Sequence, residues 1–358
     1  MLFDPRPKTR VKDLYDFENE LNTLKKYLGE PLIVVTGLRR TGKTSLILTA
    51  LNESGFPYVF FDLRTIMRSR KELYQLISAG FSEFLSRISR SEKLYRTLLR
   101  FLKFIRGVSV SGFTIEFSWG SEKPLLSEVF TALNEVGIEH DTKIIVVFDE
   151  LQKALGHASV ILQNTIAHAY DYLRNLSFVI SGSEMGVLYR FFGDPRTPLY
   201  GRAYLEVKTR RLTKEESINY LIKGFEEAGR KVELREIEEV VDKLDGIIGW
   251  LTYYGYAKIM QNKNLELIWR EAVELAKQEL EDFLKYRVGR ERYRTVLKLL
   301  AQDLRDWGRL KRKLEDLEGR AISDRVLHDI LHTLRKHTII NEQNKFLDPL
   351  VEEAAKNL

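Results

Sequence analysis

Five short apolar runs recur along the first 210 residues, and longer stretches of mixed apolar and polar residues separate them. The runs are Leu32–Thr36, Tyr58–Asp62, Lys143–Asp149, Leu176–Ser181 and Ala203–Val207. Strands of a parallel sheet are buried on both faces, so they show continuous apolar runs rather than alternation. The pattern therefore predicts an α/β fold built on a parallel sheet.

The stretches between these runs have the apolar spacing of amphipathic helices. Residues 11–28 place leucines on one stripe, 70–106 is long enough for two helices, and 124–136 begins with a proline suited to a first turn. Residues 107–120 alternate apolar and polar side chains, which predicts a β-hairpin.

From residue 213 onward the pattern becomes helical throughout. Thr213–Glu216 is a capping-box pattern that starts one helix, and residues 233–244 and 265–285 supply two more. Between these two lies a glycine-punctuated, aromatic segment, Gly246–Gly255. We interpret this region as a helical lid over a ligand cleft.

The last segment predicts three helices, Glu291–Asp303, Gly308–Leu317 and Ala321–His337, followed by a short hairpin over 338–349. Three helices and a hairpin make a winged helix-turn-helix, whose third helix would enter a DNA major groove. The predicted domains are 1–212, 213–285 and 286–358.

Composition narrows the class of protein. The 358 residues are 44% hydrophobic and 30% charged, which is typical of a globular protein. No apolar run approaches the roughly 18 residues of a membrane span, and the first residues lack a signal core. The chain has no cysteine, which excludes disulfides and thiolate metal sites. We expect a cytoplasmic protein with no membrane contact.

The net charge of +6 hides two positive segments. Residues 64–106 contain 11 Lys and Arg against 3 Asp and Glu, and residues 286–338 contain 14 against 8. The rest of the chain is negative. Two basic segments on an acidic body indicate an anionic partner such as nucleic acid, although solvated helix faces are the alternative.

The first apolar run leads into a phosphate-loop pattern, G-x-x-x-x-G-K-[ST], matched at Gly37, Gly42, Lys43 and Thr44. Two glycines let successive N–H groups point at a polyphosphate, and the next helix adds its positive N-terminal dipole. Lys43 would reach the β- and γ-phosphates of ATP or ADP, and Thr44 would hold Mg²⁺. The alternative is a plain glycine-rich turn. The predicted nucleotide-binding residues are Gly37, Leu38, Arg39, Arg40, Thr41, Gly42, Lys43, Thr44 and Ser45.

The third apolar run ends in two carboxylates, Asp149 and Glu150. Open α/β sheets bind their ligands at the carboxyl ends of the strands. Asp149 would support Mg²⁺ through its water shell, and Glu150 would orient the attacking water. An acidic pair after a strand is common without such a role, but here it follows a complete phosphate loop.

Three further features are candidates for the same site. Ser181 or Ser183 could hydrogen-bond the γ-phosphate or the water, or could only form a turn into the next helix. Arg202 could stabilise transferred charge within the chain or on a neighbouring subunit, or could be a structural arginine. Residues 2–5 could cover an adenine ring or be frayed. The predicted catalytic residues are Lys43, Glu150, Arg202 and Ser183.

Together these motifs resemble the archaeal ATPase family, which belongs to the STAND group of AAA+-related P-loop NTPases and is similar to origin-recognition ATPases. The resemblance rests on Gly37–Thr44, Phe148–Gln152, Ser181–Ser183 and Leu199–Arg202. It implies Mg-ATP binding, slow hydrolysis, a lid and a C-terminal winged helix. The turn at Gly249-Trp250-Leu251 departs from the Gly-x-Pro-like turn of relatives and has no arginine close behind it, which argues against a sensor arginine from the lid.

Three functional hypotheses follow. The first is a DNA-associated ATPase switch, in which nucleotide state repositions the winged helix on double-stranded DNA. The second is a signalling or chaperone-like ATPase whose winged helix docks a protein partner, favoured by the acidic residues mixed into 303–329. The third is a small-molecule kinase, which the water-orienting position of Glu150 disfavours.

Overall fold

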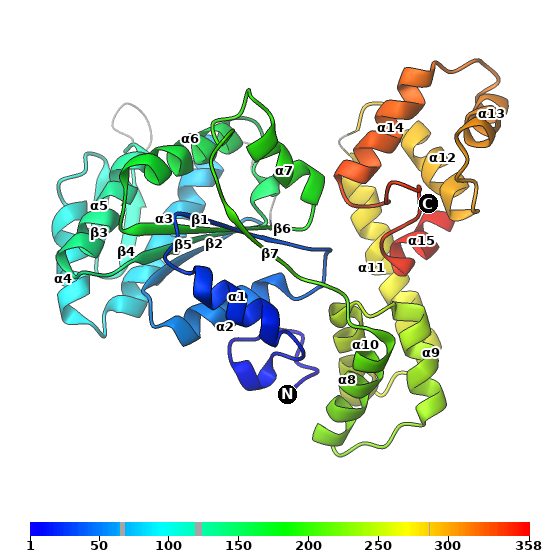
Figure 1. The fold of residues 1–358 in the computed structure, drawn as a ribbon, viewed down its shortest axis with the longest axis horizontal. Helices are drawn as coiled ribbons and strands as arrows, with labels where there is room; N and C mark the ends of the chain where they lie inside the picture. The colour runs from blue at the N-terminus through cyan, green and yellow to red at the C-terminus, as the bar shows by residue number, and fades with distance from the viewer. Residues whose placement is uncertain (65–68, 119–123, 286) are drawn as a thin grey trace.

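A computed structural model describes residues 1–64, 69–118, 124–285 and 287–358. Residues 119–120 of the predicted hairpin segment and residue 286, the first of the predicted third domain, lie outside the described residues. Figure 1 shows a sheet with helices on both faces, a helical group beside it, and a second helical group at the C-terminus.

The central sheet contains, within the described residues, five parallel strands in the order β2-β5-β6-β1-β7. They are β1 (Leu32–Thr36), β2 (Tyr58–Asp62), β5 (Ile144–Asp149), β6 (Leu176–Gly182) and β7 (Leu205–Lys208). Every residue of β1, β5 and β6 is buried, as their continuous apolar character predicts. The parallel pairing brings the carboxyl ends of these strands to one edge of the sheet.

Helices cover both faces of this sheet. On one face lie α1 (Glu18–Tyr27) and α2 (Lys43–Ser54), and on the other α3 (Arg70–Ile88), α4 (Glu92–Leu102), α5 (Leu126–Glu139) and α6 (Gly156–Tyr172). Successive side chains of β1 point to opposite faces. Ile33 and Val35 therefore join the core under α1 and α2, whereas Leu32 and Val34 join the core under the other helices.

The predicted helix over 11–28 is shorter in the structure. It begins at Glu18 because Asp16 has a φ of 55°, which a helix cannot contain, and only a 3-10 turn, η1 (Val11–Asp13), precedes it. The predicted hairpin is present as antiparallel β3 (Val108–Ser111) and β4 (Thr114–Phe117). Two short elements follow the carboxyl ends of β5 and β6, namely η2 (Leu151–Lys153) and α7 (Met185–Gly193).

The segment predicted to form the lid, which we refer to as the lid, contains α8 (Lys214–Glu227), α9 (Leu234–Leu244), α10 (Ile248–Met260) and α11 (Leu265–Lys285). The glycine-punctuated segment forms α10, which the spacing did not predict. Phe3 is fully buried between α8 and α10, where Gly224 and Gly255 make room for its ring. A Cβ at either glycine would lie 2.2 or 2.5 Å from that ring. Residues 2–8, which we call the N-terminal strap, are thereby tied to the lid.

The C-terminal segment contains α12 (Arg290–Ala301), α13 (Trp307–Glu318), α14 (Asp324–Lys336) and α15 (Pro349–Lys356). The three predicted helices are present, and the predicted hairpin is reduced, in the part of the chain that the structure describes, to a single antiparallel bridge. Only an isolated bridge joins Ile340 to Phe346 in the described chain, because Asp348 caps and Pro349 begins a fourth helix. Helix α11 packs against α15 and α12, so it runs from the lid to the C-terminal helices (Figure 1).

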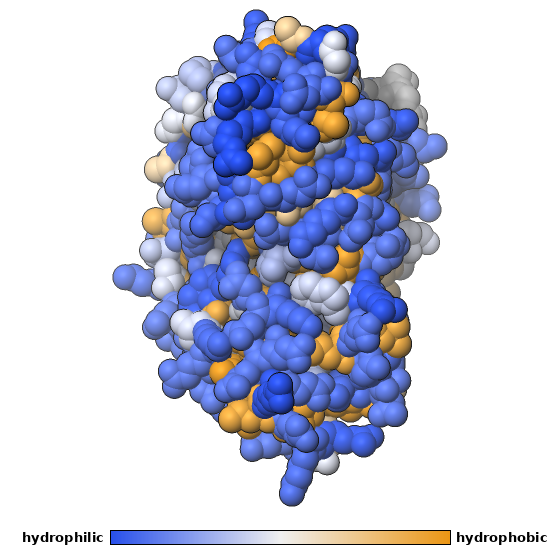
Figure 2. All heavy atoms as spheres, turned by 90° about the vertical axis from the view of Figure 1, so that its right-hand side faces the viewer, coloured by the Kyte–Doolittle hydropathy of each residue, from blue (hydrophilic) through white to orange (hydrophobic). Residues whose placement is uncertain are grey.

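The outer face of the lid and C-terminal helices is mostly polar, with apolar side chains in separate patches (Figure 2). Among the described residues, no helix has the length and apolar composition needed to cross a bilayer.

Candidate nucleotide site

The phosphate loop joins the end of β1 to the start of α2, and its conformation depends on two glycines. Gly37 has a φ of 147°, and a Cβ there would lie 2.0 Å from the Thr209 hydroxyl. Gly42 has a φ of 85° and precedes the first residue of α2. The Thr41 hydroxyl donates to the carbonyl of Leu38 (2.7 Å), which closes the turn. The loop therefore has the tightly wound form that the motif predicts.

Lys43 is buried where the loop meets the acidic pair. Its ammonium donates to the carbonyls of Gly37 (3.1 Å) and Leu38 (2.7 Å) and lies 3.9 Å from the Glu150 carboxylate. Burial lowers the pKa of Lys43, while the charges of Glu150 and Asp149 oppose that shift. The structure thus brings the predicted phosphate-binding cation next to both predicted carboxylates.

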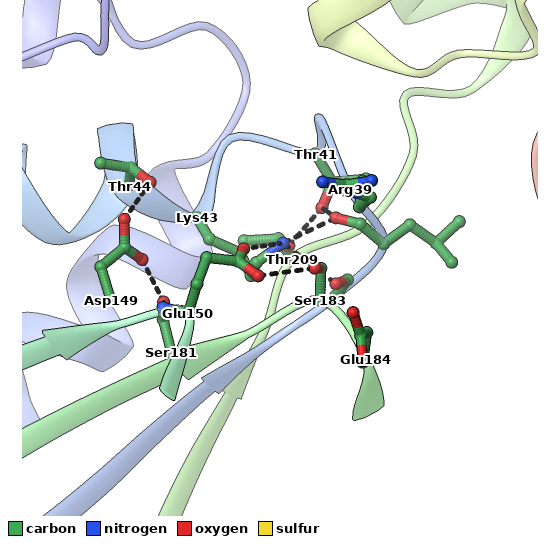
Figure 3. Close-up of polar contacts among 12 residues, drawn as sticks. Arg39, Thr41, Lys43, Thr44, Asp149, Glu150, Ser181, Ser183, Glu184 and Thr209 are labelled. Atoms are coloured by element: carbon green, nitrogen blue, oxygen red, sulfur yellow. Dashed lines mark hydrogen bonds and ion pairs between the residues drawn. The ribbon is translucent and has the colours of Figure 1, made fainter. Parts of the chain in front are cut away.

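Asp149 lies between two hydroxyls, as Figure 3 shows. Its Oδ2 accepts from Thr44 Oγ1 at 2.7 Å, and its Oδ1 accepts from Ser181 Oγ. Burial raises the pKa of Asp149, and these two hydrogen bonds oppose the rise. In the described chain, no group of three or more His, Cys, Asp or Glu could hold a metal. A hydroxyl and one carboxylate suit Mg²⁺, which keeps water and phosphate oxygens among its ligands. Thr44 and Asp149 therefore fit this ion.

Glu150 follows β5 in a left-handed conformation, with a φ of 58°. Its N–H donates to Ser181 Oγ (3.1 Å), and its carboxylate accepts from Ser183 Oγ (2.7 Å) and from the Gln152 amide. The two candidate serines thus donate to different carboxylates of the acidic pair, Ser181 to that of Asp149 and Ser183 to that of Glu150 (Figure 3).

Gln152 is a contact that the sequence reasoning missed. Its side chain is 2% exposed and holds the Glu150 carboxylate, while its own Oε1 finds no hydrogen-bond partner among the described residues. The available signal was its position two residues after the acidic pair, on the one-turn helix η2 at the same sheet edge. Gln152 therefore positions Glu150.

The outer side of the loop carries two arginines that contact the lid. Arg39 pairs with Glu279 of α11 at 2.8 Å, and Arg40 pairs with the same carboxylate at 2.5 Å. The Arg40 guanidinium also lies 3.8 Å from the centroid of the Trp250 ring. The Trp250 indole N–H in turn donates to Asp348 Oδ2 at 2.9 Å, just before α15.

Arg202 lies apart from the loop residues in this chain. Its guanidinium pairs with Asp171 at 2.5 Å and donates to the carbonyl of Pro198. The structure therefore does not bring Arg202 to the phosphate loop from its own chain, and a role on a neighbouring subunit stays a prediction.

Two cavities open beside the loop. One, of about 550 Å³, is lined by the phosphate loop, the strap residues 4–8, Tyr15 and α10. The strap is held there by a hydrogen bond from the Lys8 N–H to Ser45 Oγ (3.0 Å). The second, of about 960 Å³, lies between α7, α11 and the end of α14. Arg39 lines both cavities.

The end of β6 also contacts the C-terminal segment. Glu184, the residue after Ser183, pairs with His337 at 2.7 Å, and the Met185 N–H donates to Thr338 Oγ1 at 3.0 Å. Burial alone would raise the pKa of Glu184, but the hydrogen bond and charge of His337 and the charge of Lys153 outweigh it, so the pKa falls to about 2. Neighbouring residues of one strand end therefore touch Glu150 and the winged-helix segment.

Comparisons with known proteins agree with this architecture. A family model described as an ATPase domain predominantly from Archaea matches residues 14–253. A model of the C-terminal winged helix-turn-helix domain of MCM proteins matches residues 287–346. A comparison with curated protein sequences gave no match.

Among solved structures, a Walker-type ATPase of Pyrococcus abyssi is 32% identical and covers 99% of this chain and 100% of its own, with a TM-score of 0.82. The Cdc6p structure of Pyrobaculum aerophilum is 15% identical, with coverage of 99% and 96% and a TM-score of 0.46. The Orc1 structure of Aeropyrum pernix, in complex with DNA, is 15% identical, with coverage of 96% and 93% and a TM-score of 0.43. The first family match spans more than half of the chain, and the similarity to the Pyrococcus ATPase spans nearly all of it, so this chain belongs to the family of P-loop ATPases found predominantly in Archaea.

Proposed function

We propose that the chain binds Mg-ATP at the phosphate loop, hydrolyses it, and uses the nucleotide state to reposition its winged helix. The moving parts would be the domains 1–212, 213–285 and 286–358. The observation that carries this proposal is the pair Ser183 and Glu184 at the end of β6. Ser183 holds the Glu150 carboxylate, and Glu184 holds His337 at the end of α14. A movement of Glu150 toward a substrate water would shift Ser183 and therefore the neighbouring Glu184, which contacts His337 of the winged-helix segment.

The geometry supports a division of labour in hydrolysis. Lys43 would exchange its two loop carbonyls for the β- and γ-phosphates, since an ammonium prefers charged acceptors to neutral ones. Bound Mg²⁺ would neutralise phosphate charge, with Thr44 and Asp149 as its protein contacts. Glu150 would accept a hydrogen bond from the attacking water and orient it, while Gln152 and Ser183 fix the carboxylate.

The test of the hydrolytic role is Glu150→Gln. We expect ATP affinity within about 3-fold of wild type and turnover at least ~100-fold slower, since a positioned base contributes about 10²–10⁴-fold. Fluorescent-ATP titration and phosphate release measure the two quantities. Glu83→Gln, an exposed acid on α3, is the matched control and should hydrolyse normally. Wild-type turnover in Glu150→Gln would overturn the assignment.

We also propose that the winged helix contacts double-stranded DNA. The C-terminal end of α14 is covered, since a Cβ on Gly186 of α7 would lie 2.7 Å from the Lys336 backbone. The N-terminal half, which reads bases in helix-turn-helix proteins, is left exposed with Arg325. Exposed cations of α13 lie nearby in sequence, at Arg309, Arg312 and Lys313.

Binding to duplex DNA, measured over a range of salt concentrations with and without ATP, tests the proposal that the winged helix contacts DNA. We expect log affinity to fall linearly with log salt, at about −0.9 for each phosphate contact, and Arg325→Gln to weaken binding more than Arg196→Gln on the ATPase domain. A zero slope would contradict DNA binding.

A protein partner is the second candidate for the winged helix, because acids of the same segment already neutralise several of its cations. Lys311 pairs with Asp324 at 2.8 Å, and Arg292 pairs with Glu318 at 2.5 Å. This function is favoured over DNA binding if the protein forms an ATP-dependent complex with a protein partner and shows no affinity for DNA.

A further inference from the structure

Arg39 and Arg40 are neighbours on the phosphate loop, yet their surroundings differ sharply. Arg40 is anchored: it stacks on Trp250, makes hydrogen bonds of 2.5 and 3.1 Å to Glu279, and its carbonyl accepts from the Gly249 N–H at 2.9 Å. A Cβ on Gly249 would lie 2.6 Å from the Arg40 Cβ, so the backbone of α10 packs directly against this arginine and leaves no room for a side chain at position 249. These contacts leave Arg40 no freedom to turn toward a ligand.

Arg39 is held much more loosely. Its side chain is 48% exposed, against 25% for Arg40, and the ion pair with Glu279 is its one strong contact in the described structure. It lines the cavity that also holds Lys43, Thr44 and Glu150. Arg39 therefore lies near the position that the terminal phosphates would take.

Glu279 carries one negative charge and serves two guanidinium groups. Its side chain is only 23% exposed, and the charges of Arg39, Arg40 and Lys153 all act on it. Lys153 has a partner of its own in Glu184 at 2.6 Å, and Arg40 also lies within the influence of the Asp348 carboxylate, so Arg39 depends on its share of Glu279 alone. A second anion brought beside the loop would satisfy the guanidinium that Glu279 holds less firmly, which is Arg39.

We propose that Arg39 leaves Glu279 and contacts the γ-phosphate when ATP binds, while Arg40 stays on Glu279 and Trp250. Arg39 then supplies, from the loop itself, the charge-stabilising arginine that neither the lid nor Arg202 provides in this chain. A guanidinium on the γ-phosphate stabilises the negative charge that develops during phosphoryl transfer. This inference rests on the proposed nucleotide site and adds a catalytic residue to it.

This exchange of partners also makes the contact between Arg39 and Glu279 of the lid depend on whether a γ-phosphate is bound. ADP lacks the γ-phosphate that competes with Glu279 in this proposal, so Arg39 returns to α11 after phosphate release. The helix that bears Glu279 continues to the C-terminal helices, so the same side chain would report hydrolysis to them.

Arg39→Gln and Arg40→Gln form a matched pair for testing the proposal. In Arg39→Gln we expect turnover to fall by at least ~10³-fold, the lower end of the range for arginines that act on a γ-phosphate. The ATP affinity should fall about 10-fold while ADP affinity stays within about 2-fold, consistent with one lost charge-assisted contact. Arg40→Gln should lower thermal stability and change both affinities alike. Equal losses of ATP and ADP affinity in Arg39→Gln, or its wild-type turnover, would overturn the inference.

Glu279→Gln tests whether Arg39 exchanges Glu279 for the γ-phosphate, or whether the loss of a negative charge near the site by itself changes ATP affinity. Freed from its ion pair, Arg39 should raise ATP affinity about 3- to 10-fold relative to ADP, as expected for a pair of this exposure. In the Arg39→Gln background the same substitution should have no selective effect. A selective gain that persists without Arg39 would show a through-space effect and contradict the proposal.

Lys43→Ala distinguishes failure of this inference from failure of the nucleotide site. If Lys43→Ala no longer binds ATP or ADP while Arg39→Gln keeps wild-type affinity and turnover, the nucleotide site is correct and Arg39 has no part in the reaction. Retention of both nucleotides in Lys43→Ala would instead remove the site on which the inference rests.

Discussion

The two sides of the phosphate loop are built on different principles. On the inner side, Lys43, Thr44 and Asp149 are held within one domain by the loop and by neighbouring parallel strands. On the outer side, Arg39 and Arg40 meet a carboxylate more than 230 positions later in the chain, through ion pairs that are partly exposed. The inner side suits chemistry that needs fixed geometry. The outer side suits communication, because the half-exposed ion pair of Arg39 can be exchanged at modest cost while Arg40 stays anchored.

Lys43→Ala should produce the largest effect, because it removes the buried cation of the inner side. Charge-assisted hydrogen bonds are each worth about 1.5–3 kcal/mol, so ATP and ADP affinity should fall by at least ~100-fold. Isothermal titration measures both constants, with exposed Lys26→Ala as the control. Near-normal affinity in Lys43→Ala would mean that the inner side does not bind phosphate.

Glu184→Gln should have the next largest effect, on stability rather than on nucleotide affinity. A pKa lowered to about 2 means that the folded state favours the charged carboxylate. Burial lowers the pKa of His337, so at pH 7 the charged partner of Glu184 is Lys153. The stability is present above the ordinary glutamate pKa of about 4.5 and is lost as pH falls toward 2, so the variant should lose about 1–3 kcal/mol at pH 7. Urea unfolding at pH 7 and pH 3 measures this, and the gap to wild type should narrow at the lower pH. A gap that is constant with pH would refute the ion-pair explanation.

Trp250→Phe sharpens the comparison on the outer side. It keeps an aromatic ring for Arg40 but removes the donor to Asp348, a carboxylate whose pKa burial raises and the indole hydrogen bond lowers. Leaving a buried acceptor unpaired costs about 1–3 kcal/mol, so the melting temperature should drop while ATP affinity stays within about 3-fold. If affinity fell as far as in Lys43→Ala, the two sides of the loop would not be separable.

Arg202→Gln should give the smallest effect. In this chain it removes a partly exposed ion pair with Asp171, worth about 0.5 kcal/mol. Turnover per chain should be unchanged in dilute protein. If the wild type turns over faster at high protein concentration and the variant does not, Arg202 acts on a neighbouring subunit. If the variant is slower than the wild type even in dilute protein, the arrangement described here is contradicted.

The inner side was largely predictable from sequence, and the outer side was not. The strands before Gly37 and Asp149 are continuous apolar runs, and a phosphate-loop motif together with parallel topology requires their ends to meet. Nothing local to Arg39 or Arg40 specifies a partner as distant as Glu279, because long-range ion pairs leave no periodic pattern. The role of Gln152 had a local signal that went unused.

Two elements differ from the sequence prediction for local reasons. Helix α10 was missed because its glycines suggest breaks, yet Gly249 and Gly255 are small where Arg40 and Phe3 press against the helix. The C-terminal hairpin was expected from apolar pairs at 338–349, but the Asp348-Pro349 start of a helix ends any strand there. In both cases, tertiary packing or capping outweighed the apparent pattern.

The burial of Phe3 has a consequence for the order in which the protein matures. The strap is synthesised before the lid, and Gly224 and Gly255, which receive its ring, follow roughly 220 to 250 residues later. At about 5–20 residues per second, the ring waits for tens of seconds of translation. The sheet, complete at Lys208, can form during that interval, whereas strap and lid can close only afterwards. Since the strap lines the nucleotide cavity, a nascent chain with a finished sheet still lacks one wall of that cavity until the lid has been made.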